Sequence, residues 1–197
     1  LVGEDFFNAI GRAYLNATPP SSQLMILFGE GYSEFLEGYE PAQQIPFLPD
    51  VAKLERAWRL AYHSADIAPI SPDKLGAIPP KTLGDAQIQF LPSVAIIASH
   101  FPVHALWQAA SNMQALNDID PSKGETALIV RPDLEVMTHN IESSFGPAIH
   151  ALLKGKTLNE AAEIGMATNV NFDFSAMLTV LIQSGAIADI KINNEGN

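Results

Sequence analysis

The sequence of 197 residues contains no cysteine. Disulfide bonds, thiolate metal sites and cysteine nucleophiles are therefore excluded, because each of them needs a thiol or a thiolate. Long apolar runs are also missing: the longest, residues 94–98, is far shorter than the roughly 18 to 20 residues that a membrane span needs. The start of the chain carries Glu4 and Asp5 and no basic residue, unlike a signal peptide. We expect a cytoplasmic protein with no membrane partner.

Basic residues are scarce, with 11 Lys and Arg against 22 Asp and Glu and a net charge of -11. A protein that binds nucleic acid usually presents a basic face to the phosphates. Lys53, Arg56 and Arg59 recur at a spacing of three on a predicted helix, but Glu55 lies beside them. We interpret this group as a solvated helix face, and we expect nucleic acid to be a poor partner.

Motifs that carry chemistry are missing as well: the sequence has no phosphate-binding loop, nucleophile elbow or HExxH motif. His63 and Asp66 could share a helix face, but a metal site would need a third ligand that the sequence does not indicate. Pro102 disrupts the helical spacing of His100 and His104. We therefore expect no metal, no other cofactor and no catalytic activity of the chain by itself.

The N-terminal part has helical periodicity. Residues 5–17 place Phe6, Phe7, Ile10 and Tyr14 at helical spacing. A short helix capped by Ser21 or Ser22 is predicted to bury Leu24, Leu27 and Phe28, and another to bury Phe35, Leu36 and Tyr39. Residues 41–49 are predicted to form an extended connector, after which Asp50 is predicted to cap a helix. The inner face of this helix is predicted to carry Val51, Leu54, Trp58, Ala61, Tyr62 and Ala65. We predict a helical domain over residues 1–66.

A proline-rich linker is predicted over residues 67–84, followed by a second domain over residues 85–197. In that domain residues 87–91 alternate like a strand, and residues 126–131 and 135–140 are predicted to form a hairpin. Three helices follow, the second opened by a capping box of Thr157 and Glu160, and a closing strand ends the order. The predicted fold class is α+β: a mainly helical N-terminal domain followed by a winged-helix-like domain with a small antiparallel sheet.

An exposed strand edge can bind an extended peptide as an additional strand. We predict such an edge on the second hairpin strand, with the third helix, residues 172–184, as the other wall. The predicted peptide-binding residues are Glu135, Val136, Met137, Thr138, Phe172, Phe174, Met177 and Val180. The alternative, that the four residues of the helix are simply core, stays open at this stage.

Several segments resemble the HvfC/BufC family, whose domain has been named as DNA-binding. They include residues 1–7 with Ala13-Tyr14, residues 47–57, residues 61–66 and the later pairs Phe101-Pro102 and Leu106-Trp107. Members carry a further helical stretch upstream, so we expect this chain to lack a segment. Residues 148–155, 157–164 and 177–187 also resemble the helical part of a PqqD-type peptide-recognition element.

The resemblance implies an accessory subunit of a multinuclear-iron oxidase with a TIM-barrel fold, in a pathway that makes ribosomal peptide natural products. Such a subunit holds the precursor peptide by its leader while the oxidase modifies it. A DNA-binding transcriptional regulator is the alternative, because a winged-helix order permits both functions. The charge favours the peptide: residues 123–197 hold five basic against nine acidic residues, and residues 172–184 hold no Lys or Arg.

Overall fold

A computed structural model describes residues 1–112, 116 and 119–192. The helical N-terminal part consists of α1 (Glu4–Ala17), α2 (Tyr32–Gly38) and α3 (Leu48–Tyr62), and α5 (Val103–Ser111) joins it from later in the chain. The C-terminal part holds α6 (Phe145–Leu153), α7 (Leu158–Thr168) and α8 (Phe174–Gln183). Between them lie the short helix α4 (Pro72–Gly76) and 3-10 turns at Met25–Leu27, Glu40–Ala42 and Pro80–Asp85. The predicted α+β class with a helical N-terminal part is confirmed.

The strands form two antiparallel sheets. β2 (Ala95–Ser99), β3 (Glu125–Val130) and β4 (Met137–Ile141) form one with β3 in the centre, and β1 (Ala86–Phe90) pairs with β5 (Ile187–Ile192) in the other. The predicted hairpin is therefore present as β3 and β4, with Ile129 opposite Thr138. The closing strand is also present, but it pairs with β1 and not with the hairpin.

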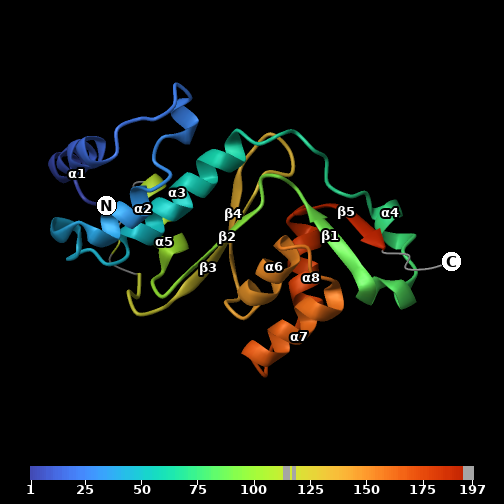
Figure 1. Ribbon diagram of the computed structural model, residues 1–197. Helices are drawn as coiled ribbons and strands as arrows, with labels where there is room; N and C mark the ends of the chain where they lie inside the picture. The colour runs from blue at the N-terminus through green and yellow to red at the C-terminus, as the bar shows by residue number, and fades with distance from the viewer. Residues whose placement is uncertain (113–115, 117–118, 193–197) are drawn as a thin grey trace.

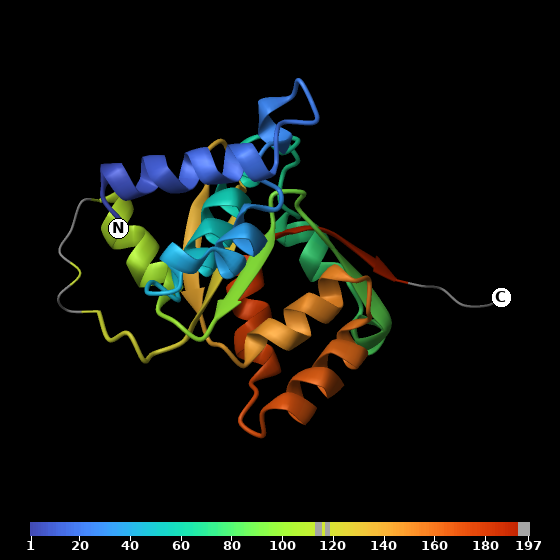
Figure 2. The ribbon, with the colours of Figure 1, turned by 60° about the vertical axis from the view of Figure 1, so that its left-hand side comes forward.

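The central strand β3 is buried on both faces, so its residues serve two cores. Ala127 and Ile129 pack with the apolar faces of α3 and α5, whereas Leu128 and Val130 pack with α6 to α8. This division follows from the alternation of side chains along a strand. Figure 1 shows α1, α2, α3 and α5 gathered on one side of β2 to β4, and α6 to α8 with β1 and β5 on the other. Figure 2 shows the start of α1 and the end of β5 on opposite sides of the molecule.

Local signals explain the C-terminal helices. The Thr157 hydroxyl accepts a hydrogen bond from the Glu160 amide, and the Glu160 carboxylate accepts one from the Thr157 amide at 2.8 Å, so the predicted capping box is confirmed. Asp173 caps α8 by accepting from the Ala176 amide at 2.9 Å. Gly185, which follows α8, has a φ of 69°, a conformation that glycine adopts without strain.

Several local details differ from the predictions. Leu24 and Leu27 are 62% and 48% exposed on a 3-10 turn and not buried on a helix. The predicted connector over residues 41–49 is not extended, because it begins in a 3-10 turn and α3 already starts at Leu48. The apolar run at residues 94–98, which was not predicted as a strand, belongs to β2. Its lack of polar alternation follows from packing against a core on each face.

None of the helices in the described ranges is long and apolar enough to cross a membrane. The predicted loop over residues 112–124 lies partly outside those ranges.

Candidate functional site

A pocket of about 680 Å³ lies where α1, α2, α3 and α5 meet. This volume is within the range of roughly 300–1,000 Å³ that is common for small-molecule sites. Six aromatic side chains contribute to its lining: Phe7, Tyr14, Phe28, Tyr32, Trp58 and Trp107. The remaining lining residues include Glu55, Arg56 and Arg59 on α3. The pocket therefore combines a large aromatic surface with a few charged groups.

The aromatic wall on the α1 and α2 side is a packed cluster. The Tyr14 ring lies 5.4 Å from the Phe28 ring and 5.0 Å from the Tyr32 ring, between centroids. Tyr14 itself is 4% exposed, whereas Phe7, about two helical turns earlier, is 60% exposed. These ring arrangements are tilted or edge-on, which aromatic pairs prefer. The Tyr14 ring is therefore held rigidly, and Phe7 stands at the open side of the pocket.

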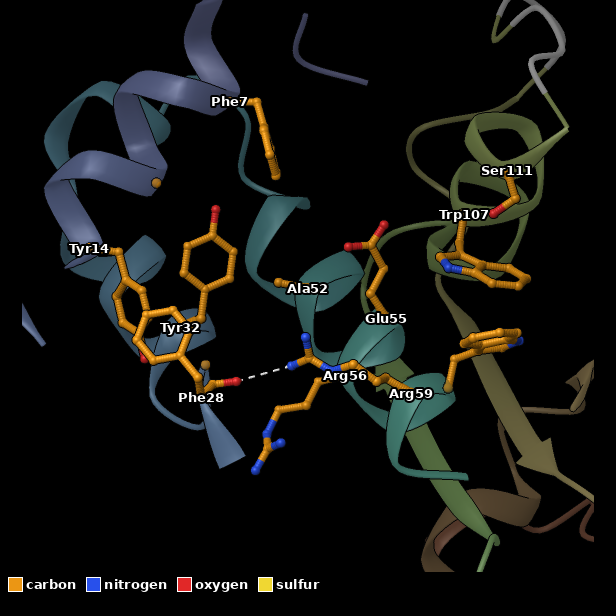
Figure 3. Close-up of a pocket in the computed structure, with 13 residues that line it drawn as sticks. Phe7, Tyr14, Phe28, Tyr32, Ala52, Glu55, Arg56, Arg59, Trp107 and Ser111 are labelled. Carbon is orange, nitrogen blue, oxygen red and sulfur yellow. Dashed lines mark hydrogen bonds between the residues drawn. The ribbon is translucent and has the colours of Figure 1, made fainter. Parts of the chain in front are cut away.

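Two guanidinium groups are held on the side of the pocket near Phe28. Arg59 Nη2 donates a hydrogen bond to the Phe28 carbonyl oxygen at 3.1 Å, drawn as a dashed line in Figure 3. Gly29 has a φ of 93°, and a Cβ there would lie 3.4 Å from Arg59 Nη2. Arg56 Nη2 is 3.8 Å from the Glu30 carboxylate, while Arg56 Nη1 is buried without a hydrogen-bond partner among the described residues.

The carboxylate of Glu55 points the other way. Figure 3 shows it beside Trp107 and directed toward Phe7, away from both guanidinium groups, and the Tyr32 hydroxyl also points toward Phe7. Within the described part of the chain, Glu55 makes no hydrogen bond or ion pair. Desolvation by the pocket walls raises the pKa of Glu55, although the positive charges of the Leu1 amino group and Arg59 act against this. The pocket walls desolvate Glu55 only in part, because its side chain stays exposed to solvent through the open side of the pocket.

The same surroundings act on Tyr32. Desolvation raises the pKa of the Tyr32 phenol, and the negative charge of Glu55 raises it further. The phenol therefore stays protonated and can donate a hydrogen bond into the pocket. The pocket thus presents a carboxylate and a hydroxyl, both free of partners within the described ranges, against aromatic rings.

The predicted peptide-binding residues lie in two separate places. Glu135, Val136, Met137 and Thr138 lie at the start of β4 or just before it, and β4 is an edge of the three-stranded sheet. Met137 is 45% exposed. No backbone hydrogen bond outside the sheet reaches residues 137–141 from any described residue. The outward edge of β4 therefore has backbone groups available for an added strand.

The helical residues of the prediction belong to the opposite core. Val136 packs with the cluster under α3 and α5, whereas Phe172, Phe174 and Val180 pack with the cluster under α6 to α8. The Phe172 ring stands edge-on to the Phe145 ring, with 6.1 Å between centroids. Met177 is 0% exposed and so offers nothing to a peptide in this structure. The structure therefore does not bring the β4 residues and Met177 together in one groove.

No group of three or more potential metal-ligating residues occurs among the residues that the structure describes. Asp66, considered with His63 in the sequence, pairs with Arg131 at 2.7 Å. His104 and His139 each bury an Nε2 atom without a partner in the described part of the chain. Burial lowers the pKa of His139, and the charge of His104 lowers it further. Burial therefore favours the neutral form of the His139 imidazole.

Comparison of the sequence with known protein-family models and with curated proteins finds no match. The resemblance to the HvfC/BufC family therefore stays a prediction.

Sequence reasoning missed the aromatic pocket. Its α3 residues were noticed, because Lys53, Arg56 and Arg59 recur at a spacing of three, but they were interpreted as a solvated face. Arg59 and Glu55 are indeed exposed to solvent, but together with the partly buried Arg56 they also line the pocket, which this interpretation did not anticipate. The remaining walls come from residues 7–32 and from α5, and no local pattern links segments so far apart in sequence.

Proposed function

We propose that the protein is a cytoplasmic, non-catalytic accessory subunit that binds the leader of a precursor peptide and presents it to a multinuclear-iron oxidase. The observation that carries the proposal is the unpaired outer edge of β4. Adding a strand there would satisfy the free backbone groups of β4, and neighbouring side chains would select the peptide. The proposal requires no cofactor in this chain, since the iron belongs to the partner.

Two exposed apolar residues at or near this edge support a peptide partner. Met137 at the start of β4 is 45% exposed, and Leu134 in the turn before β4 is 78% exposed. An added strand would cover such apolar side chains, which contributes about 25 cal/mol per Å² of apolar surface removed from water. The resemblance to the HvfC/BufC family and to a PqqD-type element supports the same function.

Co-expression tests the partners. We expect the protein to co-purify with an iron oxidase and a short precursor peptide encoded beside its own gene, and to bind a synthetic peptide of the leader sequence. Failure of the protein to bind either component, each purified and folded, would argue against the accessory function.

Proline substitutions test the edge. Adjacent residues of an antiparallel strand alternate between pointing their N–H inward to the ladder and outward to solvent. One of Met137→Pro and Thr138→Pro should therefore keep most of the ladder, because proline is tolerated where the N–H faces outward. We expect that variant to melt near the wild-type temperature and to lose binding of the leader peptide.

The second edge strand supplies the matched control. Ile97→Pro and Ala98→Pro test β2 in the same way, because β2 also lies at an edge of the sheet. The folded variant of this pair should bind the leader peptide normally. Loss of binding in the β2 variant alone would place the peptide at the opposite edge and overturn the assignment to β4.

A further inference from the structure

We propose that the aromatic pocket between α1, α2, α3 and α5 is a second binding site, which takes the cationic side chain of a lysine or arginine from a protein partner. The pocket is built from elements other than β4, so the inference does not rest on the proposed peptide-binding edge.

The chemistry of the walls selects a cation with an apolar stem. Organic cations are attracted to the faces of aromatic rings, most strongly to tryptophan. Trp58 and Trp107, together with four Phe and Tyr side chains, provide such faces. An apolar stem is favoured by the same rings, because lysine and arginine bury their methylene groups while the charged head finds a polar partner.

Glu55 supplies the partner for the charged head. Its carboxylate lines the pocket without an ion pair in the described part of the chain, and Figure 3 shows it directed into the same space as the Tyr32 hydroxyl. Partial desolvation raises the pKa of Glu55 even though its side chain stays exposed, and a bound cation would favour the ionised form. The carboxylate can therefore pair with a cation that enters from the open side of the pocket.

The two arginine residues of the lining do not fill this position. Arg59 donates to the Phe28 carbonyl oxygen, and Arg56 lies 3.8 Å from Glu30. Both guanidinium groups are thus held on the Phe28 side, whereas the Glu55 carboxylate faces Phe7 and Trp107 (Figure 3).

Size and charge both favour a protein segment as the source of the cation. About 680 Å³ exceeds what one side chain fills, so flanking residues of the partner can enter with it. The net charge of -11 attracts a basic partner over a longer range. A lysine or arginine within a basic segment fits the local and the overall charge.

The protein carries its own reporter for a binding test. Its two tryptophans, Trp58 and Trp107, both line the pocket, so intrinsic fluorescence reports on this site. We would titrate the full chain with three acetylated and amidated tripeptides, Gly-Lys-Gly, Gly-Arg-Gly and Gly-norleucine-Gly, and confirm each affinity by calorimetry. The norleucine peptide keeps the apolar stem and lacks the charge. We expect both basic peptides to bind at least about tenfold more tightly than the norleucine peptide, as a charge-assisted contact would give.

Substitutions assign the effect to Glu55. Glu55→Gln should abolish the preference for lysine over norleucine, because it removes the charge and keeps the shape. Glu163→Gln removes the same charge from an exposed position on α7 and should leave the preference unchanged. The preference should also weaken as the pH falls toward the raised pKa of Glu55.

Each contrary result overturns the inference. Equal affinity for the lysine and norleucine peptides would make the pocket merely apolar. An unchanged preference in Glu55→Gln would place the cation elsewhere. Tighter binding of a Gly-Glu-Gly peptide than of Gly-Lys-Gly would assign the pocket to anions held by Arg56. None of these results depends on β4, whose proline variants should bind the lysine peptide like the wild type.

Discussion

The Arg131 guanidinium pairs with the Asp66 carboxylate at 2.7 Å and joins the end of β3 to the segment after α3. Arg131 is 7% exposed, and its Nε also donates to the Ala61 carbonyl oxygen at 2.9 Å. Its Nη2 donates to the Ser64 carbonyl oxygen as well. One buried side chain therefore bonds a carbonyl group in the last turn of α3 and another in the segment that follows it. These contacts of Arg131 link α3 to the three-stranded sheet.

The first prediction concerns this junction. Arg131→Ala should lower the free energy of unfolding by about 1–3 kcal/mol, because it removes the hydrogen bonds that a buried guanidinium group donates to the Ala61 and Ser64 carbonyl oxygens. Asp66→Ala should cost less than about 1 kcal/mol, since the Asp66 side chain is 73% exposed and contributes as a surface pair does. Urea unfolding of both variants measures the difference. Equal losses in the two variants would show that the ion pair, and not the carbonyl contacts, stabilises the junction.

The second prediction concerns Met177. Because its side chain is 0% exposed, Met177→Ala should cost about 2–5 kcal/mol, as expected for truncation in a packed core. Met177→Glu should prevent folding, since it buries a charge without a partner. Val170→Glu is the control, because Val170 is 92% exposed and the change should stay within about 0.5 kcal/mol. A Met177→Glu variant that melts like the wild type would contradict the core position of Met177 and support its place in a peptide-binding groove.

The third prediction concerns pH. Burial lowers the pKa of His139 in the folded protein, with a smaller contribution from His104. The unfolded chain therefore binds more protons, and stability falls as the pH drops below the ordinary histidine pKa of about 6.5. His139→Gln should reduce this loss of stability between about pH 7.5 and about pH 5.5, a range that brackets the ordinary histidine pKa.

His104 on α5 and Glu125 on β3 are the neighbouring titratable groups in this interpretation. The Glu125 carboxylate already accepts from the Ala105 amide and the Asn140 side chain, both at 3.0 Å. His150→Gln, at an exposed position of α6, is the control and should lose stability with acid as the wild type does. Thermal melting at each pH is the measurement, and parallel curves for His139→Gln and the wild type would contradict the prediction.

The fourth prediction concerns nucleic acid. We expect only weak, salt-sensitive association with random duplex DNA, because the net charge is -11 and α8 carries no Lys or Arg. A gel shift at physiological salt is the measurement. Micromolar or tighter binding there would favour the DNA-binding alternative over the peptide-binding proposal.

Features set by neighbouring residues could be predicted from the sequence. The periodicity of Ile10 and Tyr14 predicted α1, and the capping box of Thr157 and Glu160 predicted the start of α7. The hairpin of β3 and β4 was predicted within a few residues, although β4 begins at Met137 and not at residue 135. Such signals depend on contacts within one turn of helix or across one tight turn. They can therefore be recognised from residues that are close together in the sequence.

The sites depend on contacts between distant segments. The sequence indicated that residues 172–184 hold more apolar side chains than one buried stripe needs, but only the packing decided that Met177 is core. Likewise Trp58 and Trp107 gave ordinary helical patterns, and the folded chain placed both on one pocket with Glu55. The charge, the absence of thiols and the helix caps were determined by the sequence. Which side chains share a pocket was decided by tertiary packing, because α3 and α5 pack together on one face of β3 and α1 and α2 pack in turn against α3.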